Sequence, residues 1–234
     1  MGSRFPKFER TDGVKQMLVP VPHCELCFKP IPQSYGRTTG QCYHCYTGSP
    51  IDGETLERVI AATLYIPNVD GYAHSEEILA LKGGGLADQY AEVLMHVCGE
   101  EELKFRRNGL LVPIPRTTPR RATSGPEALA TSLSPECGLG VRKTLSFTRA
   151  VRSQKGLSAA ERKKNVENSM ASDTSVSGRD IYLVDDILTT GETMHEGARA
   201  VRQAGATSAI GLVAGRDASL SDLEYAGVLK RVEE

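Results

Sequence analysis

The chain has 234 residues, of which 40% are hydrophobic and 24% charged, so it is long and apolar enough to form a globular core. Its 28 basic and 29 acidic residues give a net charge of −1, which excludes a basic field over the whole surface and leaves nucleic acid only a local patch. No apolar run approaches the ~18 residues of a transmembrane helix, and the start lacks the apolar stretch of a secretory leader. We therefore expect no membrane contact and a cytoplasmic location.

The first elements in chain order are an extension over residues 1–20 and a cysteine-rich segment over residues 21–50. This segment holds two C-x-x-C pairs, Cys24 with Cys27 and Cys42 with Cys45. The 14 residues between the pairs are rich in proline, glycine and polar side chains. Four thiolates at this spacing can surround one tetrahedral zinc ion, and the metal would stabilise a segment too small for its own core. We predict a structural zinc ribbon.

A redox-active dithiol and a set of free buried cysteines are the alternatives to zinc. A redox C-x-x-C normally opens a helix next to a βαβ unit, whereas both pairs here lie in loops rich in proline and glycine. His23 and His44 flank the pairs and can replace a thiolate, although each fits better as a bystander or as a group that contacts the metal ligands. A closed four-cysteine site has no open position, so no zinc chemistry is expected.

Residues 51–234 are predicted to form one α/β domain in which helices and strands alternate. The expected helices are 52–63, 75–82, 86–97, 124–133 and 192–204, and the expected strands are 109–116, 141–145, 181–184 and 209–214, with a short extended piece at 65–68. Glycines 83–85 separate the second and third helices, and Gly205 ends the last one. This alternation predicts a parallel sheet that binds ligands at the carboxyl ends of its strands.

The most informative segment is residues 181–193. Residues 181–184 predict a buried strand, Asp185 and Asp186 follow where it should end, and a loop of threonines and glycine then leads into a helix. The backbone amides of such a loop, with the positive end of the helix dipole, can hold a phosphate. The carboxylates can accept hydrogen bonds from a vicinal diol, so we predict a site for a sugar 5-phosphate with free 2- and 3-hydroxyls. The alternative is an ordinary turn with a helix cap, which explains Thr193 but not the adjacent acids.

This segment resembles the 5-phosphoribosyl 1-pyrophosphate (PRPP) signature of type I phosphoribosyltransferases. Over about residues 21–216 the chain resembles the ComF-like family, in which a zinc ribbon precedes such a domain. The landmarks are the two cysteine pairs, residues 81–83, residues 111–115 with arginines at 116, 120 and 121, and residues 153–166. The last block is the most specific, because the family carries a similar Q-x-G-L-S-x-x-x-R-x-x-N-V run.

The resemblance implies a type I phosphoribosyltransferase fold with a Rossmann-like parallel sheet. It also implies transfer of a 5-phosphoribosyl group from PRPP to an unidentified acceptor, with release of pyrophosphate. Asp185 and Asp186 would grip the ribose hydroxyls, directly or through Mg²⁺. The 5-phosphate would bind to Leu188, Thr189, Thr190, Gly191, Glu192 and Thr193. The candidates for the pyrophosphate loop are Pro115, Arg116 and Arg120, and the candidates for a mobile lid are Gln154, Lys155 and Arg162. A solvated surface cluster is the alternative for these basic residues.

The family association with natural competence and DNA uptake implies a second function. The protein would then be a non-catalytic PRPP or nucleotide sensor, or a DNA-uptake accessory protein that binds single-stranded DNA or a helicase-like partner. Against DNA binding through the ribbon, Lys29 and Arg37 are its only lysine and arginine residues, and Glu25 opposes them. A degenerate domain kept as a scaffold is the third hypothesis. Type I relatives are often dimers, so a homodimer is also among the expected partners.

Overall fold

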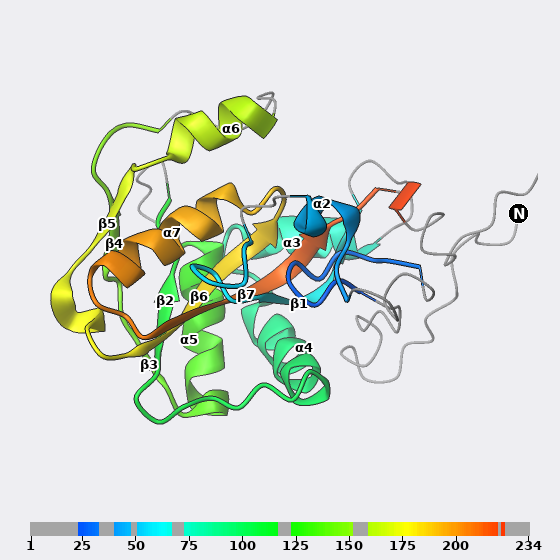
Figure 1. Cartoon of the computed structure of the whole chain (residues 1–234). Coiled ribbons are helices and arrows are strands. Elements are labelled where there is room, and N and C mark those ends of the chain that lie inside the picture. Colours follow the sequence, from blue (N-terminus) through cyan, green and yellow to red (C-terminus); the bar gives the residue numbers. More distant parts are fainter. Residues whose placement is uncertain are drawn as a thin grey trace, which may run out of the picture.

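The computed structural model describes residues 23–32, 40–47, 51–66, 73–116, 123–151, 159–219 and 221–222. The centre of the fold is a five-stranded sheet with the order β1-β7-β6-β2-β3, in which every neighbouring pair is parallel (Figure 1). Strands β4 and β5 pair antiparallel outside this sheet. The predicted α/β class with a parallel sheet is therefore confirmed.

The bounds of the elements follow the predicted alternation with some exceptions. The strands are β1 (Val59–Tyr65), β2 (Leu110–Pro113), β3 (Gly140–Val141), β4 (Leu145–Phe147), β5 (Met170–Ser172), β6 (Asp180–Leu188) and β7 (Ser208–Asp217). The helices are α2 (Tyr43–Tyr46), α3 (Ala73–Leu81), α4 (Ala87–Glu100), α5 (Gly125–Cys137), α6 (Ala159–Val166) and α7 (Glu192–Gln203), with a 3₁₀ turn at Thr174–Val176.

The helix predicted over residues 52–63 is wrong, because β1 occupies its second half. Residues 59–64 are all buried, and such a continuous buried run suits a parallel strand. Asp52 does accept hydrogen bonds from the backbone N–H groups of Thr55 (2.8 Å) and Glu54 (3.0 Å), but these close a bend rather than a helix. The apolar spacing that indicated a helix fits both structures.

Two further predictions about strands need correction. The strand predicted over 141–145 is two strands, since β3 lies at the edge of the main sheet and β4 pairs with β5. Strand β6 does not end before its two acids: Asp185 lies opposite Val213, and Leu188 lies opposite Arg216. The acids therefore belong to the last paired residues of the strand, which fixes their backbone more firmly than a loop would.

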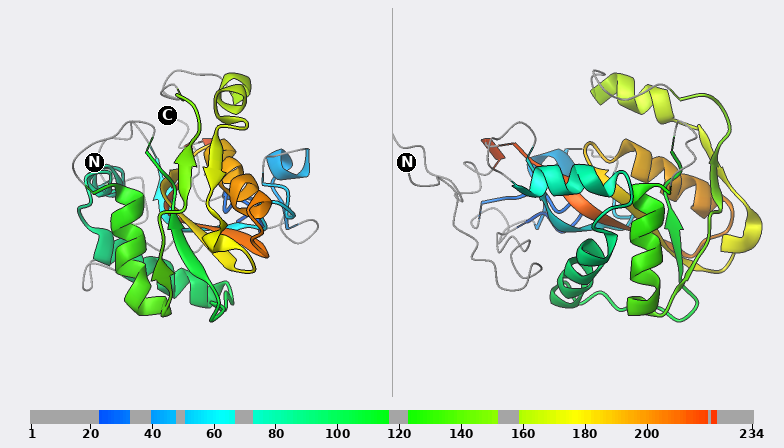
Figure 2. Two further views of the ribbon diagram at one scale, coloured as in Figure 1. Left: turned by 90° about the vertical axis from the view of Figure 1, so that its left-hand side faces the viewer. Right: turned by 180° about the vertical axis from the view of Figure 1, so that it is seen from behind.

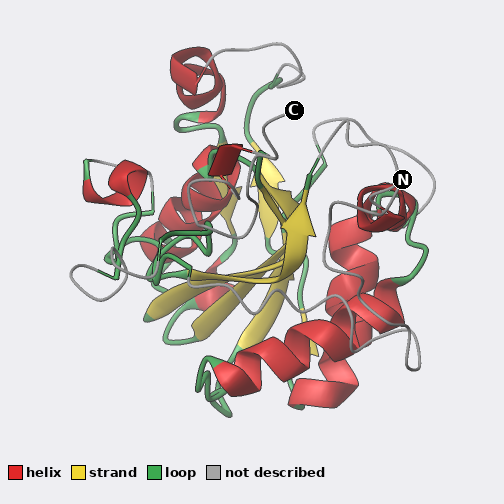
Figure 3. Ribbon diagram, turned by 90° about the vertical axis from the view of Figure 1, so that its right-hand side faces the viewer, coloured by secondary structure: helices red, strands yellow, loops and turns green. Residues whose placement is uncertain are grey.

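Helices cover both faces of the sheet. Figures 2 and 3 show α4 and α5 on one face and α7 on the other. The chain leaves β2 towards β3 and leaves β6 towards β7, so the connections of these two adjacent strands run in opposite directions. The carboxyl ends of β2 and β6 therefore form a topological switch point, the place where ligands bind in open α/β sheets.

An arm made of β4, β5 and α6 extends beside α7 (Figure 1). Glu196, which is buried on α7, accepts a hydrogen bond from the backbone N–H of Met170 (2.8 Å). Arg199 donates to the carbonyl of Met170 (2.8 Å) and to both carboxylate oxygens of Glu196 (2.7 Å each). This ion pair therefore anchors β5 to α7 and fixes the base of the arm.

The cysteine-rich segment is part of the main core. All four of its cysteines are buried in the same apolar cluster as β1 and β7. The backbone N–H of Val59 donates to the carbonyl of Leu26 (2.7 Å), which joins this segment to the edge strand β1. Within the described ranges, no helix is long and apolar enough to cross a membrane.

Candidate functional site

The acid pair lies on β6 beside the switch point. Asp185 and Asp186 are half-buried, and each accepts a hydrogen bond from the next backbone N–H, at 2.9 and 2.8 Å. Removal from water and then repulsion by Asp186 raise the pKa of Asp185 well above its usual range, while the charge of Lys82 acts against them. Two adjacent, partly buried carboxylates that repel each other favour the binding of a cation or of a ligand rich in hydroxyl groups.

The predicted phosphate loop leads directly from these acids into α7. Gly191 is the N-cap residue and has a φ of 90°, a left-handed conformation that favours glycine. It has no side chain to cap the helix, and its carbonyl accepts a hydrogen bond from the N–H of His195 (2.8 Å). Thr189 and Thr190 are half-buried beside it. A turn of this kind at a helix N-terminus is an anion-binding geometry.

Arg116, three residues after the end of β2, connects the segment that follows α3 with the segment that precedes α5. Its guanidinium donates hydrogen bonds to the carbonyls of Lys82 and, at 3.4 Å, Thr123. A Cβ atom on Gly125 would lie 2.7 Å from the carbonyl oxygen of Leu81, so α5 begins in close contact with the end of α3. Arg116 thus holds the loop after α3 in place, and Lys82 is a cation near Asp185 that the prediction of site residues omitted.

Several predicted residues cannot be compared with this geometry. Arg120, Gln154 and Lys155 lie outside the described residues, and Arg162 lies on α6 with an undescribed side chain. Pro115 is described, half-buried and adjacent to Arg116. The structure therefore brings together the acids, the phosphate loop and the end of β2.

The four predicted metal ligands do come together. The sulfur atoms of Cys24, Cys27, Cys42 and Cys45 all lie within 4.8 Å of one another and are buried. The backbone N–H of Cys45 points at the sulfur of Cys42 (3.4 Å), a bond that favours a thiolate. Four converging thiols fit the tetrahedral ligand set of structural zinc, so this cluster can hold the ion.

The flanking histidines are not part of the cluster. The Nε2 atom of His23 lies 3.0 Å from the carboxylate of Glu101, and its ring stacks on Phe28 with centroids 3.9 Å apart. His44 is exposed on α2. Its pKa is lowered, first by partial burial and then by the charges of Lys29 and Arg216. The cluster found among the described residues consists of the four cysteines and includes neither histidine.

Arg216 is a residue that the reading of the sequence missed. It is only 5% exposed on β7, although arginine is rarely buried without a partner. Its guanidinium donates to the carbonyl of Cys27 (2.9 Å) and to those of Leu188 (2.9 Å) and Thr189 (2.7 Å). The available signal was an arginine two residues after the predicted buried strand at residues 209–214.

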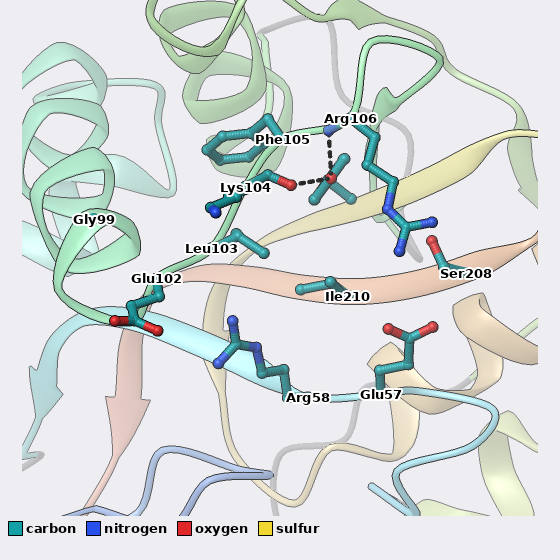
Figure 4. Close-up of a pocket in the computed structure, with 11 residues that line it drawn as sticks. Glu57, Arg58, Gly99, Glu102, Leu103, Lys104, Phe105, Arg106, Ser208 and Ile210 are labelled. Carbon is teal, nitrogen blue, oxygen red and sulfur yellow. Dashed lines mark hydrogen bonds between the residues drawn. The ribbon is translucent and has the colours of Figure 1, made fainter.

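A separate cavity of about 800 Å³ lies at the opposite end of the sheet (Figure 4). It is formed around the amino ends of β1, β6 and β7, and its rim includes Arg58, Lys104 and Arg106. Arg106 pairs with Asp180 (3.3 Å), and Arg58 lies 3.8 Å from the carboxylate of Glu101. Because two of its three cations are already paired, this cavity is a weaker candidate than the acid pair and loop at the switch point.

A comparison with protein families identifies one part of the chain. Residues 123–228 match the family model of the phosphoribosyl transferase domain. This range contains the acid pair, the phosphate loop and Arg216. The phosphoribosyltransferase fold predicted from the sequence is therefore confirmed.

Curated relatives carry a name that refers to DNA. DNA utilization protein YhgH of Escherichia coli K12 is 41% identical over 66 residues, which cover 28% of this chain and 29% of that protein. The protein of the same name from Escherichia coli O157:H7 is 36% identical over 66 residues, with the same coverage. The match thus spans less than a third of these relatives. With the domain match and the four-cysteine cluster, it confirms the predicted resemblance to the ComF-like family.

Solved structures are more distant. Glutamine PRPP amidotransferase from B. subtilis, complexed with ADP and GMP, is 17% identical with a TM-score of 0.38, covering 56% of this chain and 26% of that one. The protein TT1426 from Thermus thermophilus is 16% identical with a TM-score of 0.36, covering 59% of this chain and 76% of that one. The fold assignment rests on the strand order and the family match instead of these structures.

Proposed function

Because residues 123–228 match the family model of the phosphoribosyl transferase domain, we propose that the protein binds PRPP and transfers its 5-phosphoribosyl group to an acceptor. The observation that carries this proposal is the acid pair at the switch point, followed at once by the Gly191 turn into α7. The acids suit the ribose diol and the turn suits the 5-phosphate, so one ligand satisfies both. In this proposal residues 21–50 are the ribbon and residues 51–234 the transferase domain.

Residues of this chain supply the binding groups in the proposal. Asp185 and Asp186 accept hydrogen bonds from the 2- and 3-hydroxyls, and the amides and hydroxyls of residues 188–193 hold the 5-phosphate. Mg²⁺ suits adjacent carboxylates and phosphate oxygens, and it would neutralise charge on the pyrophosphate group. Lys82 adds a cation near Asp185, and Pro115 and Arg116 form the neighbouring loop.

In the transfer step the bond between C1 of ribose and the pyrophosphate oxygen breaks, and a bond from C1 to the nucleophile of the acceptor forms. The electron pair leaves with pyrophosphate, and positive charge develops on the sugar. The tasks of the protein are to orient the ribose, to neutralise the leaving group and to exclude water. Arg120, Gln154, Lys155 and Arg162 are the proposed groups for the last two tasks.

The second proposed function is binding without transfer. The name of the YhgH relatives supports a role in DNA utilisation for this protein as well, with single-stranded DNA or a helicase-like protein as partner. Tyr43 and Tyr46 on α2 are 71% and 68% exposed, and exposed aromatic rings can stack on unpaired bases. A cytoplasmic location and a homodimer belong to both proposals, the former because reduced thiols are needed for the metal cluster.

Calorimetric titration of Mg²⁺-PRPP into zinc-loaded protein tests the first proposal. The Asp185→Asn/Asp186→Asn double variant should lose binding, whereas Asp88→Asn, a carboxylate on α4 bonded to Ser132 (2.6 Å), should bind as the wild type does. Pyrophosphate release with candidate acceptors then separates transfer from simple binding. Equal responses of the wild type and the double variant would contradict the proposed site. Salt-dependent DNA binding without pyrophosphate release would favour the second function.

A further inference from the structure

Arg216 connects the cysteine cluster to the phosphate loop. Its Nε atom donates to the carbonyl of Cys27, and its Nη1 atom donates to the carbonyls of Leu188 and Thr189, with all three distances between 2.7 and 2.9 Å. Cys27 is one of the four thiols of the cluster, Leu188 ends β6, and Thr189 begins the loop into α7. One side chain therefore contacts two sites that lie more than 150 residues apart in the sequence.

Among the described residues, Arg216 is a buried cation without a paired carboxylate. The guanidinium is almost fully buried, and no carboxylate within the described ranges forms an ion pair with it. Its partners are neutral carbonyl groups, which compensate only part of the cost of burying a charge. Four thiolates around Zn²⁺ carry a net charge of about −2, so the loaded cluster would supply the missing negative charge.

The second contact of Arg216 reaches the backbone of the phosphate loop. In a trans peptide unit the C=O of one residue and the N–H of the next point in opposite directions. Where loop carbonyls face the guanidinium, the following N–H groups therefore point away from it, towards the side where an anion would bind. Gly191, two residues after Thr189, has no Cβ to restrict its own backbone. The position of the loop therefore depends on the guanidinium, and the guanidinium depends on the charge of the cluster.

We propose that Arg216 is a positioning residue that couples zinc at the cysteine cluster to ligand binding at the phosphate loop. Zinc then tightens the binding of a phosphoribosyl ligand without touching it, and by reciprocity the ligand tightens the binding of zinc. This inference rests on the proposed PRPP site for its second half. Its first half, the charge match between Arg216 and the loaded cluster, stands without PRPP.

The test measures zinc affinity by competition with a chromogenic chelator, with and without saturating Mg²⁺-PRPP. In the wild type, PRPP should tighten zinc binding by at least about 5-fold, the lower end of common coupling between sites. Arg216→Gln should weaken zinc binding about 10-fold without PRPP and reduce the effect of PRPP to less than about 2-fold, because the charge that links the sites is gone. Arg216→Lys should retain the zinc affinity better than Arg216→Gln.

Arg202→Gln is the matched control. Arg202 also donates to backbone carbonyls, those of Glu54 (2.8 Å), Thr55 (3.4 Å) and Thr207, and it pairs with the carboxylate of Glu57 (3.2 Å). None of these partners belongs to the cysteine cluster or the loop. It should lower the melting temperature while leaving the coupling at the wild-type value, which separates coupling from general stability.

Each outcome bears on a different half of the inference. If the wild type binds PRPP but its zinc affinity is unchanged, coupling is refuted while the proposed function stands. If the wild type does not bind PRPP, the proposed function fails, and an unchanged zinc affinity in Arg216→Gln then refutes the charge match. Should Arg216→Gln not fold, the wild-type measurement with and without PRPP decides the coupling by itself.

Discussion

Replacing Asp185 with asparagine should stabilise the free protein although it removes a binding group. The pKa of Asp185 is raised by burial and by the neighbouring Asp186, so ionised Asp185 destabilises the native state at neutral pH. Asparagine keeps the shape and carries no charge. We expect a gain in the range of single stabilising substitutions, about 0.5–2 kcal/mol, and each kcal/mol corresponds to roughly 2–4 °C in melting temperature for a chain of this size.

The pH dependence of this difference is a sharper test than its size. An acid with a raised native pKa costs no stability below its unfolded pKa of about 3.9, because it is then protonated in both states. The cost grows as pH rises from there and becomes constant above the native pKa. Melting temperatures of the wild type and Asp185→Asn should therefore nearly coincide near pH 4 and separate towards pH 7. A variant less stable than the wild type at pH 7, or a gap independent of pH, would refute this account of the acid pair.

Two other substitutions test the packing that positions the site. Glu196→Gln removes the carboxylate that pairs with Arg199 and accepts the N–H of Met170, and it should cost about 1.5–3 kcal/mol in a urea titration. Burial acts to raise the pKa of Glu196, but the hydrogen bonds from Arg199 lower it overall. The stability lost in Glu196→Gln should therefore shrink as pH falls through the native pKa of Glu196. A loss that does not change with pH would contradict the ion pair. Gly197→Val should cost about 1–3 kcal/mol, since a Cβ there would lie 2.8 Å from Cδ1 of Ile114. Gly99→Val, where nothing lies within 4 Å, is its control and should be nearly neutral; equal costs would mean that packing around Gly197 is not tight.

Local patterns predicted those elements whose signal is unambiguous. The strand before Asp185 and the helix after Gly191 were predicted because a buried run, an acid pair and a glycine turn occur together. Residues 59–64 were misassigned because apolar side chains occupy every position except Thr63, so a helical face can be found in a run that is buried on both sides as a strand. Strands β4 and β5 pair although more than 20 residues separate them in the sequence. A local residue pattern cannot predict such a contact.

The site also depends on long-range contacts that residue patterns do not reveal. Arg116 was predicted as a ligand of pyrophosphate, yet its guanidinium bonds to the carbonyls of Lys82 and Thr123. Its role in ligand binding remains a prediction. Arg216 was overlooked because its importance comes from Cys27 and Leu188, which lie far away in the chain. Motifs thus identified the ligand-binding segments, whereas the residues that hold those segments together became visible only in three dimensions.

These contacts change how the cysteine-rich segment should be studied. Leu26 accepts a hydrogen bond from the edge strand β1, and Cys27 accepts one from Arg216, so the segment covers a sheet edge and contributes to a buried charge. Deleting it would expose the backbone of β1, which favours association with other chains, and would leave Arg216 without one of its carbonyl partners. A truncated domain that failed to bind PRPP would therefore say nothing about the transferase site itself. Single substitutions in the full chain, with zinc content measured for each, are the appropriate way to separate the two sites.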